Sequence, residues 1–467
     1  MFMTRRNILR VFAALMGSVL VISLACLNGV DYRPYFREKY YAGTVARLQA
    51  ATATNNVVQG ELAAGFGRAL LTPKINAPQD NAVKGEFRSL PLAGYGSRHG
   101  KFAQGVHDDL YVKAVALRVG HRLGIMVGMD ALIVPAEVTD LAMEQLQHEL
   151  GLSRDQIYLS ATHTHSSLGG WGEGKVAEAF AGGFQPGVRI WFAERIVAAV
   201  HEAMADLRPA EIGEGSFPAP EFVRNRVVGQ SGSVDPEFSY ILLKQGSGKS
   251  AVLGSYAAHA TVSSSDLLEF SADYPGYWQR AVEQATGGLA VFLAGGVGSH
   301  SPVPPERGFA GAERMGQALA QKVIANLPQL ALTNSIPFGI LGVQVSLPPT
   351  NVRLTDGLRL RPWLAREILP VKETTFLQAF RLGDSVWVST PCDFSGELVL
   401  GIKADLRRRG INPVITSFNG DYIGYVILPK YYHLDGYEPR TMSFFGPNVP
   451  DYFSDLIRSL ALALYRN

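Results

Sequence analysis

The chain has 467 residues, of which 47% are hydrophobic and 18% are charged, and its formal net charge is +2. This is an ordinary globular composition, and the length is sufficient for a large α/β domain. The charges are nearly balanced and form no basic stripe, so nucleic acid is not expected as a partner. Of the two cysteines, Cys26 lies in an apolar leader and only Cys392 remains, which excludes an intramolecular disulfide in the folded body.

The first residues have the composition of a targeting segment. Residues 4–10 contain Arg5, Arg6 and Arg10 and no acidic residue, and residues 11–27 are almost all apolar. That apolar run is slightly short for a membrane-spanning helix of ~20 residues and slightly long for a signal core of ~7–15. The neighbouring Arg5 and Arg6 resemble a twin-arginine export signal, and no A-x-A cleavage site follows.

We therefore expect residues 1–28 to be a signal or membrane-anchor segment, and anchoring is favoured over cleavage. Positive charge precedes the apolar run, which places the body outside the cytoplasm, on the periplasmic or extracellular face. Residues 29–59 are expected to form a helical stalk or linker, because they contain tyrosine, arginine and alanine without turn signals.

From residue 60 onward, one pattern of elements occurs three times. Two apolar strands form a hairpin, a helix follows, and a further strand ends in a polar loop. The expected strands and helices of the three units are 112–119, 124–129, 138–150 and 156–160; 240–244, 251–256, 274–285 and 289–294; and 375–381, 385–389, 397–409 and 414–418. We predict one large α/β domain over residues 60–467, with mixed β-sheets, flanking helices and three related βαβ-like units. The alternative is that hairpin–helix–strand is a common arrangement and the repeat is fortuitous.

The segment 160–166, with the sequence SATHTHS, is the most informative part of the chain. Side chains on one face of a strand recur every second residue, so His163 and His165 should point to the same side of the preceding strand. Neutral imidazole is the commonest ligand of transition metals, and zinc is the usual metal. The alternative is that one histidine caps the strand and the other packs in the core.

Three further polar residues follow strands of the repeated pattern. These are His259, Asp393 and Tyr425. A catalytic zinc needs about three protein ligands and an open position, which two imidazoles and a carboxylate provide. Tyr425 would complete the shell as a phenolate or act as a hydrogen-bond donor. Taken singly, His259 is a candidate core histidine and Asp393 a candidate helix N-cap, but their equivalent positions favour a shared metal site.

The chain contains a series of short stretches that occur together in one known family. In chain order they are Gly65-Phe66-Gly67-Arg68-Ala69, Ala93-Gly94-Tyr95-Gly96, Leu110-Tyr111-Val112-Lys113-Ala114, the SATHTHS segment, Asn225-Arg226, Tyr256-Ala257-Ala258-His259-Ala260-Thr261, Ser271-Ala272-Asp273-Tyr274-Pro275-Gly276-Tyr277, Gly298-Ser299-His300-Ser301-Pro302, Tyr422-x-x-Tyr425 and Phe445-Gly446-Pro447. By these stretches the chain resembles the neutral (non-lysosomal) ceramidases, over their catalytic domain only. The resemblance implies a zinc hydrolase that acts on a linear amide, in lipid and sphingolipid metabolism.

The resemblance also implies a metal shell. One zinc ion per chain would be held by His163, His259, Asp393 and Tyr425. Glu397 is a rival to Asp393, because the family carries a glutamate where this chain has the shorter aspartate.

Other positions of the family motif are implied to handle the substrate. His165 would lie beside the metal and bind substrate, and Arg226 would bind a substrate oxygen. Ser301 would contact the substrate amide or act as a nucleophile, and Tyr425 would take part in catalysis.

The loops expected to face the substrate depart from the family pattern at several positions, which include Ser167, Leu168, Val227, Ser299 and Val303. We therefore expect a zinc-dependent amidohydrolase that cleaves an N-acyl amide of lipid type, with an altered choice of amide. One alternative is an exported metal-dependent esterase or amidase for a non-sphingolipid substrate. Another is a membrane-held pseudoenzyme that binds lipid without turnover. The sequence does not define an oligomeric state.

Overall fold

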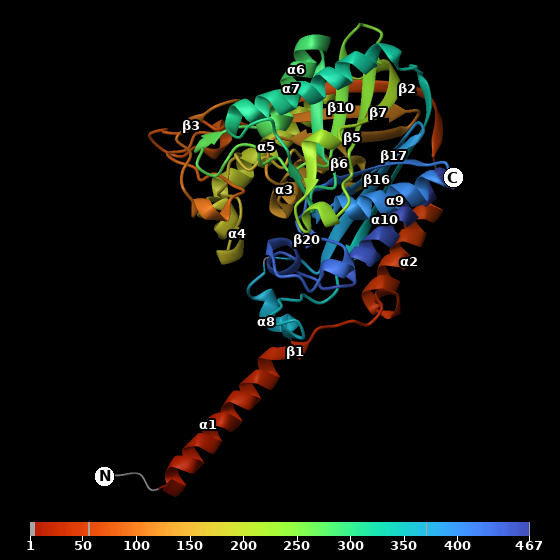
Figure 1. Cartoon of the computed structure of the whole chain (residues 1–467). Helices are drawn as coiled ribbons and strands as arrows, with labels where there is room; N and C mark the ends of the chain where they lie inside the picture. The colour runs from red at the N-terminus through yellow and green to blue at the C-terminus, as the bar shows by residue number, and fades with distance from the viewer. Residues whose placement is uncertain (1–4, 55–56, 370, 467) are drawn as a thin grey trace.

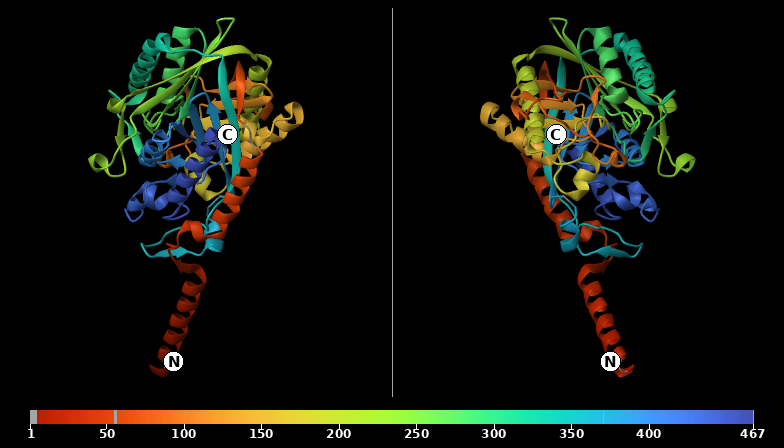
Figure 2. Two further views of the ribbon diagram at one scale, coloured as in Figure 1. Left: turned by 90° about the vertical axis from the view of Figure 1, so that its right-hand side faces the viewer. Right: turned by 90° about the vertical axis from the view of Figure 1, so that its left-hand side faces the viewer.

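A computed structural model describes residues 5–54, 57–369 and 371–466. The first helix, α1 (Arg5–Cys26), projects alone from the body in all three views (Figures 1 and 2). Its length and apolar composition are sufficient to cross a membrane, a property that a signal sequence shares. The rest of the chain forms one α/β body with mixed sheets and flanking helices, as predicted from the sequence.

The body contains three units of the same topology. In each, an antiparallel hairpin is followed by a helix and then by a strand parallel to the second hairpin strand. The first unit is β4 (Tyr111–Val119), β5 (Arg122–Met129), α3 (Ala136–Leu150) and β6 (Ile157–Ala161). The second is β9 (Glu237–Gln245), β10 (Ser250–Tyr256), α6 (Asp273–Thr286) and β12 (Leu289–Ala294). The third is β16 (Thr374–Leu382), β17 (Ser385–Thr390), α9 (Gly396–Arg407) and β19 (Asn412–Ser417). The repeat read from the sequence is therefore confirmed.

Local chemistry accounts for these elements. Helix α3 buries Val138, Ala142 and Leu146 on one face and ends at Gly151, whose φ of 67° is a conformation that glycine adopts without strain. The parallel strands are buried along their whole length, and so they consist of nearly continuous apolar and small residues.

Long strands join the three units into a single sheet. Strand β2 (Val58–Leu70) pairs with β4 and with the connecting strands β7 (Arg208–Pro218) and β14 (Ser335–Ser346). The sheet is covered by α5 (Pro186–Ala205), which packs on β2 and β4, by α6 with α7 (Gly308–Asn326), and by α10 (Val449–Arg466). The remaining short elements are β1 (Leu27–Gly29), β3 (Gly105–Val106), α4 (Lys175–Ala181), β8 (Val223–Asn225), β11 (Glu269–Phe270), β13 (His300–Pro302), β15 (Leu358–Leu360), α8 (Pro362–Arg366), β18 (Asp393–Phe394) and β20 (Tyr425–Val426).

Hydroxyl groups tie the carboxyl ends of the three units together in the interior. Ser160 Oγ donates to the carbonyl of Ser417 at 2.8 Å, and Ser417 Oγ donates to the carbonyl of Gly295 at 2.8 Å. The strand ends β6, β19 and β12 therefore converge, and the loops that follow them surround one site.

The expected stalk is not a free-standing element. Helix α2 (Lys39–Ala53) lies within the 29–59 segment but packs on β14 and buries Thr44 and Leu48. The hydroxyl of Thr44 accepts a hydrogen bond from the Ser346 amide at 2.9 Å and one from Tyr452 at 2.8 Å. The segment is helical as predicted, but it is part of the body because the buried Thr44 pairs with residues about 300 and 400 positions later. Residues 55 and 56 lie outside the described residues.

Candidate metal centre and active site

Each unit places one polar side chain at the same buried point. His163 follows β6, His259 follows β10, and Asp393 follows β17. Tyr425 lies beyond β19 on β20, which pairs in parallel with β18 so that Tyr425 is opposite Asp393. All four side chains are buried.

The candidate metal-ligating atoms of His163, His259 and Asp393 lie close together. The Nε2 atoms of His163 and His259 are 2.8 Å apart. Asp393 Oδ1 lies 3.3 Å from the first of these atoms and 3.7 Å from the second. The sequence-predicted trio is thus brought together at the carboxyl ends of strands.

Hydrogen bonds on the far side of each ring define the tautomers. His163 Nδ1 is 2.6 Å from the carbonyl of Leu132, and His259 Nδ1 is 3.0 Å from the carbonyl of Val297. A carbonyl oxygen only accepts, so both Nδ1 atoms donate, and in a neutral ring Nε2 then carries a lone pair. Burial, with a further contribution from Arg226, holds the pKa of His259 well below its usual value and favours the neutral ring.

Two lone pairs and a carboxylate oxygen therefore face one another in a buried space. Asp393 Oδ1 has no hydrogen-bond partner there, while its Oδ2 accepts from the hydroxyl of Tyr422 at 2.8 Å. A cation bound between the rings would satisfy this Oδ1 atom, which no hydrogen bond reaches. The donor set of two imidazole nitrogens and one carboxylate oxygen suits zinc.

Tyr425 and Arg226 form the polar edge of the site. The Tyr425 hydroxyl lies 3.4 Å from His259 Nε2 and accepts from Arg226 Nη2 at 2.8 Å. Arg226 Nε is in turn 2.8 Å from a Glu438 carboxylate oxygen. Burial raises the pKa of Tyr425 well above its usual value, and the guanidinium of Arg226 acts in the opposite direction.

His165 lies beside His163, but both residues follow the end of β6 at Ala161, and His163 has a φ of 63°, so strand alternation does not explain their proximity. The two Nε2 atoms are 3.3 Å apart, and the ring of His165 is 4.8 Å from that of Tyr95. Burial lowers the pKa of His165 well below its usual value. A side chain at Gly94 would place its Cβ 2.6 Å from the His165 ring, so the backbone there approaches the site as closely as a glycine allows.

The backbone around the centre is strained. His163 and Phe418 have φ angles of 63° and 68°, which are uncommon for non-glycine residues. Phe418 stacks on the His163 imidazole with ring centroids 4.3 Å apart and an interplanar angle of 12°. Residues in such conformations cluster at functional sites, where the surrounding structure holds them in place.

The SATHTHS segment is fixed by a buried arginine. Arg98 is 1% exposed, and its guanidinium donates to the carbonyls of Ala93, His165, Ser265 and Leu267. It thereby joins the loop after His165 to the loop that follows His259. Burial lowers the pKa of Arg98 to about 10, and the ring of nearby carbonyl groups suits a planar guanidinium.

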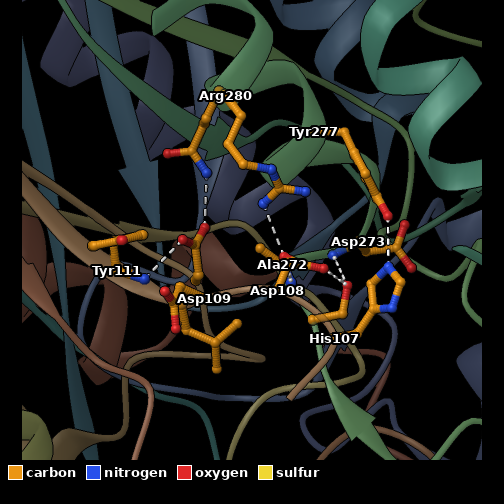
Figure 3. A network of polar contacts seen from close by, with 12 residues as sticks. His107, Asp108, Asp109, Tyr111, Ala272, Asp273, Tyr277 and Arg280 are labelled. Carbon is orange, nitrogen blue, oxygen red and sulfur yellow. Dashed lines mark hydrogen bonds and ion pairs between the residues drawn. The ribbon is translucent and has the colours of Figure 1, made fainter. Parts of the chain in front are cut away.

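A second network, centred on Asp108, holds the same segment from the side of α6 (Figure 3). Asp108 accepts from Ser271 Oγ at 2.5 Å, from the Ala272 amide at 3.0 Å and from Arg280 Nη1 at 2.9 Å. The Ser271 carbonyl accepts from Thr164 Oγ1 at 2.6 Å. The two family stretches around Thr164 and Ser271 are therefore in direct contact.

The structure distinguishes the two candidate carboxylates. Glu397 is occupied elsewhere, because it accepts from Asn225 Nδ2 at 2.9 Å and from Tyr431 OH at 3.1 Å. Asp393, and not Glu397, lies beside the imidazoles. Ser301 lies on β13 opposite Arg224 of β8, and within the part of the chain that the structure describes no hydrogen bond joins its hydroxyl to the imidazole cluster. Its role stays a prediction.

One cavity lies at this centre and a second one lies beside it. A small one of about 20 Å³ is lined by His163, His165, Asp393 and Tyr425. A larger one of about 560 Å³ lies beside it. The two share the walls Ile133, Phe180 and Tyr422. The larger space is wide enough for an apolar chain, and its shared walls place it next to the small cavity that the imidazoles line.

Some contributors to the site were not singled out by the sequence. Tyr422, which donates to Asp393, stands in the Tyr422-x-x-Tyr425 pair, and that motif was the available signal. Arg98 follows the Ala-Gly-Tyr-Gly stretch but belongs to no expected strand end. The carbonyls of Leu132 and Val297 are backbone groups, so the amino-acid types at these positions do not reveal that they accept hydrogen bonds from the histidines.

Comparison with known proteins agrees with this geometry. Residues 80–297 match the family model described as neutral/alkaline non-lysosomal ceramidase, N-terminal. In sequence the chain is similar to neutral ceramidases. It is 25% identical over 240 residues to the neutral ceramidase of Pseudomonas aeruginosa, and 25% identical over 271 residues to that of Mycobacterium tuberculosis. These matches cover 47% and 50% of this chain but only 36% and 42% of the two ceramidases.

Solved ceramidase structures share the fold. The crystal structure of the Pseudomonas aeruginosa neutral ceramidase has a TM-score of 0.70 at 20% identity, and covers 86% of this chain and 74% of its own. A ceramidase complexed with C2 has a TM-score of 0.71 at 19% identity, and covers 87% of this chain and 75% of its own. The predicted fold class is thereby confirmed.

Proposed function

We propose that the protein is a zinc-dependent amidohydrolase that cleaves an N-acyl amide of lipid type. Cleavage of such an amide is the reaction that the name of the similar neutral ceramidases implies for those proteins. One observation carries the proposal. Two imidazole lone pairs and an unpaired carboxylate oxygen face one another at the carboxyl ends of strands, beside a cavity of about 560 Å³.

The residues that would hold zinc are His163, His259 and Asp393, with Tyr425 at the edge of the shell. Zinc, when bound there, supplies a Lewis acid that polarises a carbonyl and makes water nucleophilic near neutral pH.

The chain's own residues perform the remaining tasks. Arg226 and Tyr425 present an N–H and an O–H donor at the polar edge, where negative charge develops on the amide oxygen. His165 is neutral, and its Nε2 lies beside His163. It can therefore take a proton from the attacking water and pass that proton to the leaving amine. The buried surroundings exclude water and strengthen both effects.

Two other functions are consistent with the same site. An exported esterase or amidase for a non-sphingolipid substrate would use the same zinc, donors and cavity. A lipid-binding pseudoenzyme would keep the cavity without turnover, and the converging unpaired ligand atoms favour an enzyme over it.

We expect the substrate preference to differ from that of a ceramidase. Purified zinc-loaded protein should hydrolyse an N-acyl lipid amide, while ceramide should be cleaved poorly, because Ser299 and Val303 replace family residues in the loop around β13. If the Ser301 hydroxyl hydrogen-bonds the substrate, Ser301→Ala should cost at least ~1 kcal/mol of transition-state stabilisation. The assay compares kcat/KM over a panel of N-acyl lipids for wild type, Ser301→Ala and His163→Ala.

Two results of that assay would contradict the expectation. Efficient ceramide turnover would overturn the altered preference. Absence of turnover of every amide and ester would favour the pseudoenzyme.

We also propose that α1 anchors the body to a membrane on its non-cytoplasmic face. The basic residues Arg5, Arg6 and Arg10 precede the apolar run, and such residues stay inside. Protease added to cells with a permeabilised outer envelope should digest the body. Protection until the inner membrane is broken would refute the orientation.

A further inference from the structure

Several large apolar side chains are exposed around the base of α1. Leu354 is 50% exposed, Leu358 43%, Trp363 56% and Ile368 46%. These four residues, here called the collar, come from β15, from α8 and from the chain on either side of them. All four lie within the segment 354–368, and large apolar side chains exposed together mark interaction surfaces.

The collar is attached to the end of α1. The Arg361 amide donates to the carbonyl of Cys26 at 2.8 Å, and Arg361 Nε donates to that of Leu24 at 3.0 Å. Trp363 Nε1 donates to the carbonyl of Ala25 at 3.4 Å. Strand β1, which directly follows α1, pairs with β15. Figure 1 shows α8 at the side of the body from which α1 departs.

The same segment borders the large cavity beside the metal centre. Arg366, Leu369 and Val371 line that cavity from the α8 side, and Phe180 and Tyr422 line it where it meets the small cavity at the imidazoles. The large cavity therefore borders the α8 segment on one side and, through the shared walls Ile133, Phe180 and Tyr422, the small cavity at the imidazoles on the other.

We propose that the collar is a membrane-contact surface that inserts at the headgroup level of a lipid bilayer, so that the lipid amide enters the cavity from the membrane past α8. This rests on the proposed function and anchor. We expect this surface to contact a bilayer because Trp363 of the collar is hydrogen-bonded to the last turn of α1. The length and apolar composition of α1 suit a bilayer. Tryptophan with an apolar body and a polar N–H is typical of that interface, and basic side chains such as Arg361 and Arg366 are favoured beside it.

The tryptophans of the chain provide a direct test. The chain has five, and Trp171, Trp191, Trp278 and Trp387 are buried, whereas Trp363 is exposed. The full chain is reconstituted in phosphatidylcholine vesicles with or without bromine on the upper acyl chain. The emission that Trp363→Phe removes should be quenched by the brominated lipid and shielded from aqueous acrylamide. Emission that acrylamide quenches and the brominated lipid does not would overturn the proposal.

Activity provides the second test. Trp363→Ser combined with Ile368→Ser should lower turnover of a long-chain N-acyl amide in vesicles by about tenfold or more, and leave a short-chain, water-soluble N-acyl amide within about twofold. Phe102→Ser is the matched control, because Phe102 is 53% exposed and lies just ahead of β3, on another part of the body (Figure 1). It should leave both substrates within about twofold.

The outcomes separate this inference from the proposed function. An equal loss on both substrates, or no loss on either, would overturn the collar as an entry surface. If wild type cleaves neither substrate, the amidohydrolase proposal fails, and the fluorescence measurement alone still decides whether the collar contacts lipid.

Discussion

Replacing His163 with alanine should remove the bound zinc and lower kcat/KM by at least about 10³-fold, or about 4 kcal/mol of transition-state free energy. The imidazole contributes one of two ring nitrogens, which lie 2.8 Å apart, and faces Asp393 Oδ1 at 3.3 Å. Its loss leaves two protein ligands where a catalytic zinc needs about three. The carboxylate would then remain buried without a cation, which opposes folding as well as catalysis.

Elemental analysis measures the zinc content, and thermal unfolding measures the stability that zinc confers; neither measurement needs a substrate. Wild type should carry one zinc per chain and lose stability on chelation, by about 4 kcal/mol if free zinc stood at a thousand times its dissociation constant. The unfolding of His163→Ala should not respond to chelator. His148→Ala is the control, because His148 is exposed on α3. No stoichiometric metal in wild type, together with unchanged stability and activity in His163→Ala, would end the zinc proposal.

The repeated units could be predicted because their signals are local. Each hairpin, helix and parallel strand is contiguous in sequence, and a glycine such as Gly151 marks where a helix ends. Polar residues at strand ends then identified His163, His259 and Asp393, because strands of one topology place their carboxyl ends together. That argument depends on residue type and spacing alone.

What could not be predicted depends on contacts distant in sequence. The packing of α2 rests on Thr44, whose partners Ser346 and Tyr452 lie about 300 and 400 residues later. Nothing in residues 29–59 indicates those partners, so the segment has the local properties of a stalk. Likewise, the tautomers of the two imidazoles are determined by the carbonyls of Leu132 and Val297, and every residue has a carbonyl.

The choice between Asp393 and Glu397 as the candidate ligand also required the three-dimensional structure. Both lie near the start of α9, one helical turn apart, and both are carboxylates. Asn225 and Tyr431 satisfy Glu397, whereas Asp393 Oδ1 has no hydrogen-bond partner. The difference lies in their neighbours, which come from other parts of the chain.

Tyr425→Phe should lower kcat by about 10²- to 10³-fold while one zinc per chain is retained. The hydroxyl accepts from Arg226 at 2.8 Å and lies 3.4 Å from His259 Nε2, so its own proton is available to a charge that develops beside the imidazoles. Phenylalanine keeps the ring and its packing but removes that donor. His163, His259 and Asp393 remain to hold the metal, so we expect the loss in catalysis rather than in zinc content.

Elemental analysis and kcat on the same preparations distinguish the two roles that Tyr425 could have. Tyr465→Phe, on α10 outside the site, is the control and should leave kcat within about twofold. If Tyr425 and Arg226 act as one donor pair, the loss in Tyr425→Phe combined with Arg226→Lys should be smaller than the product of the two single losses. Zinc lost from Tyr425→Phe, with kcat restored by added zinc, would instead identify Tyr425 as a metal ligand, and an unchanged kcat would exclude both roles.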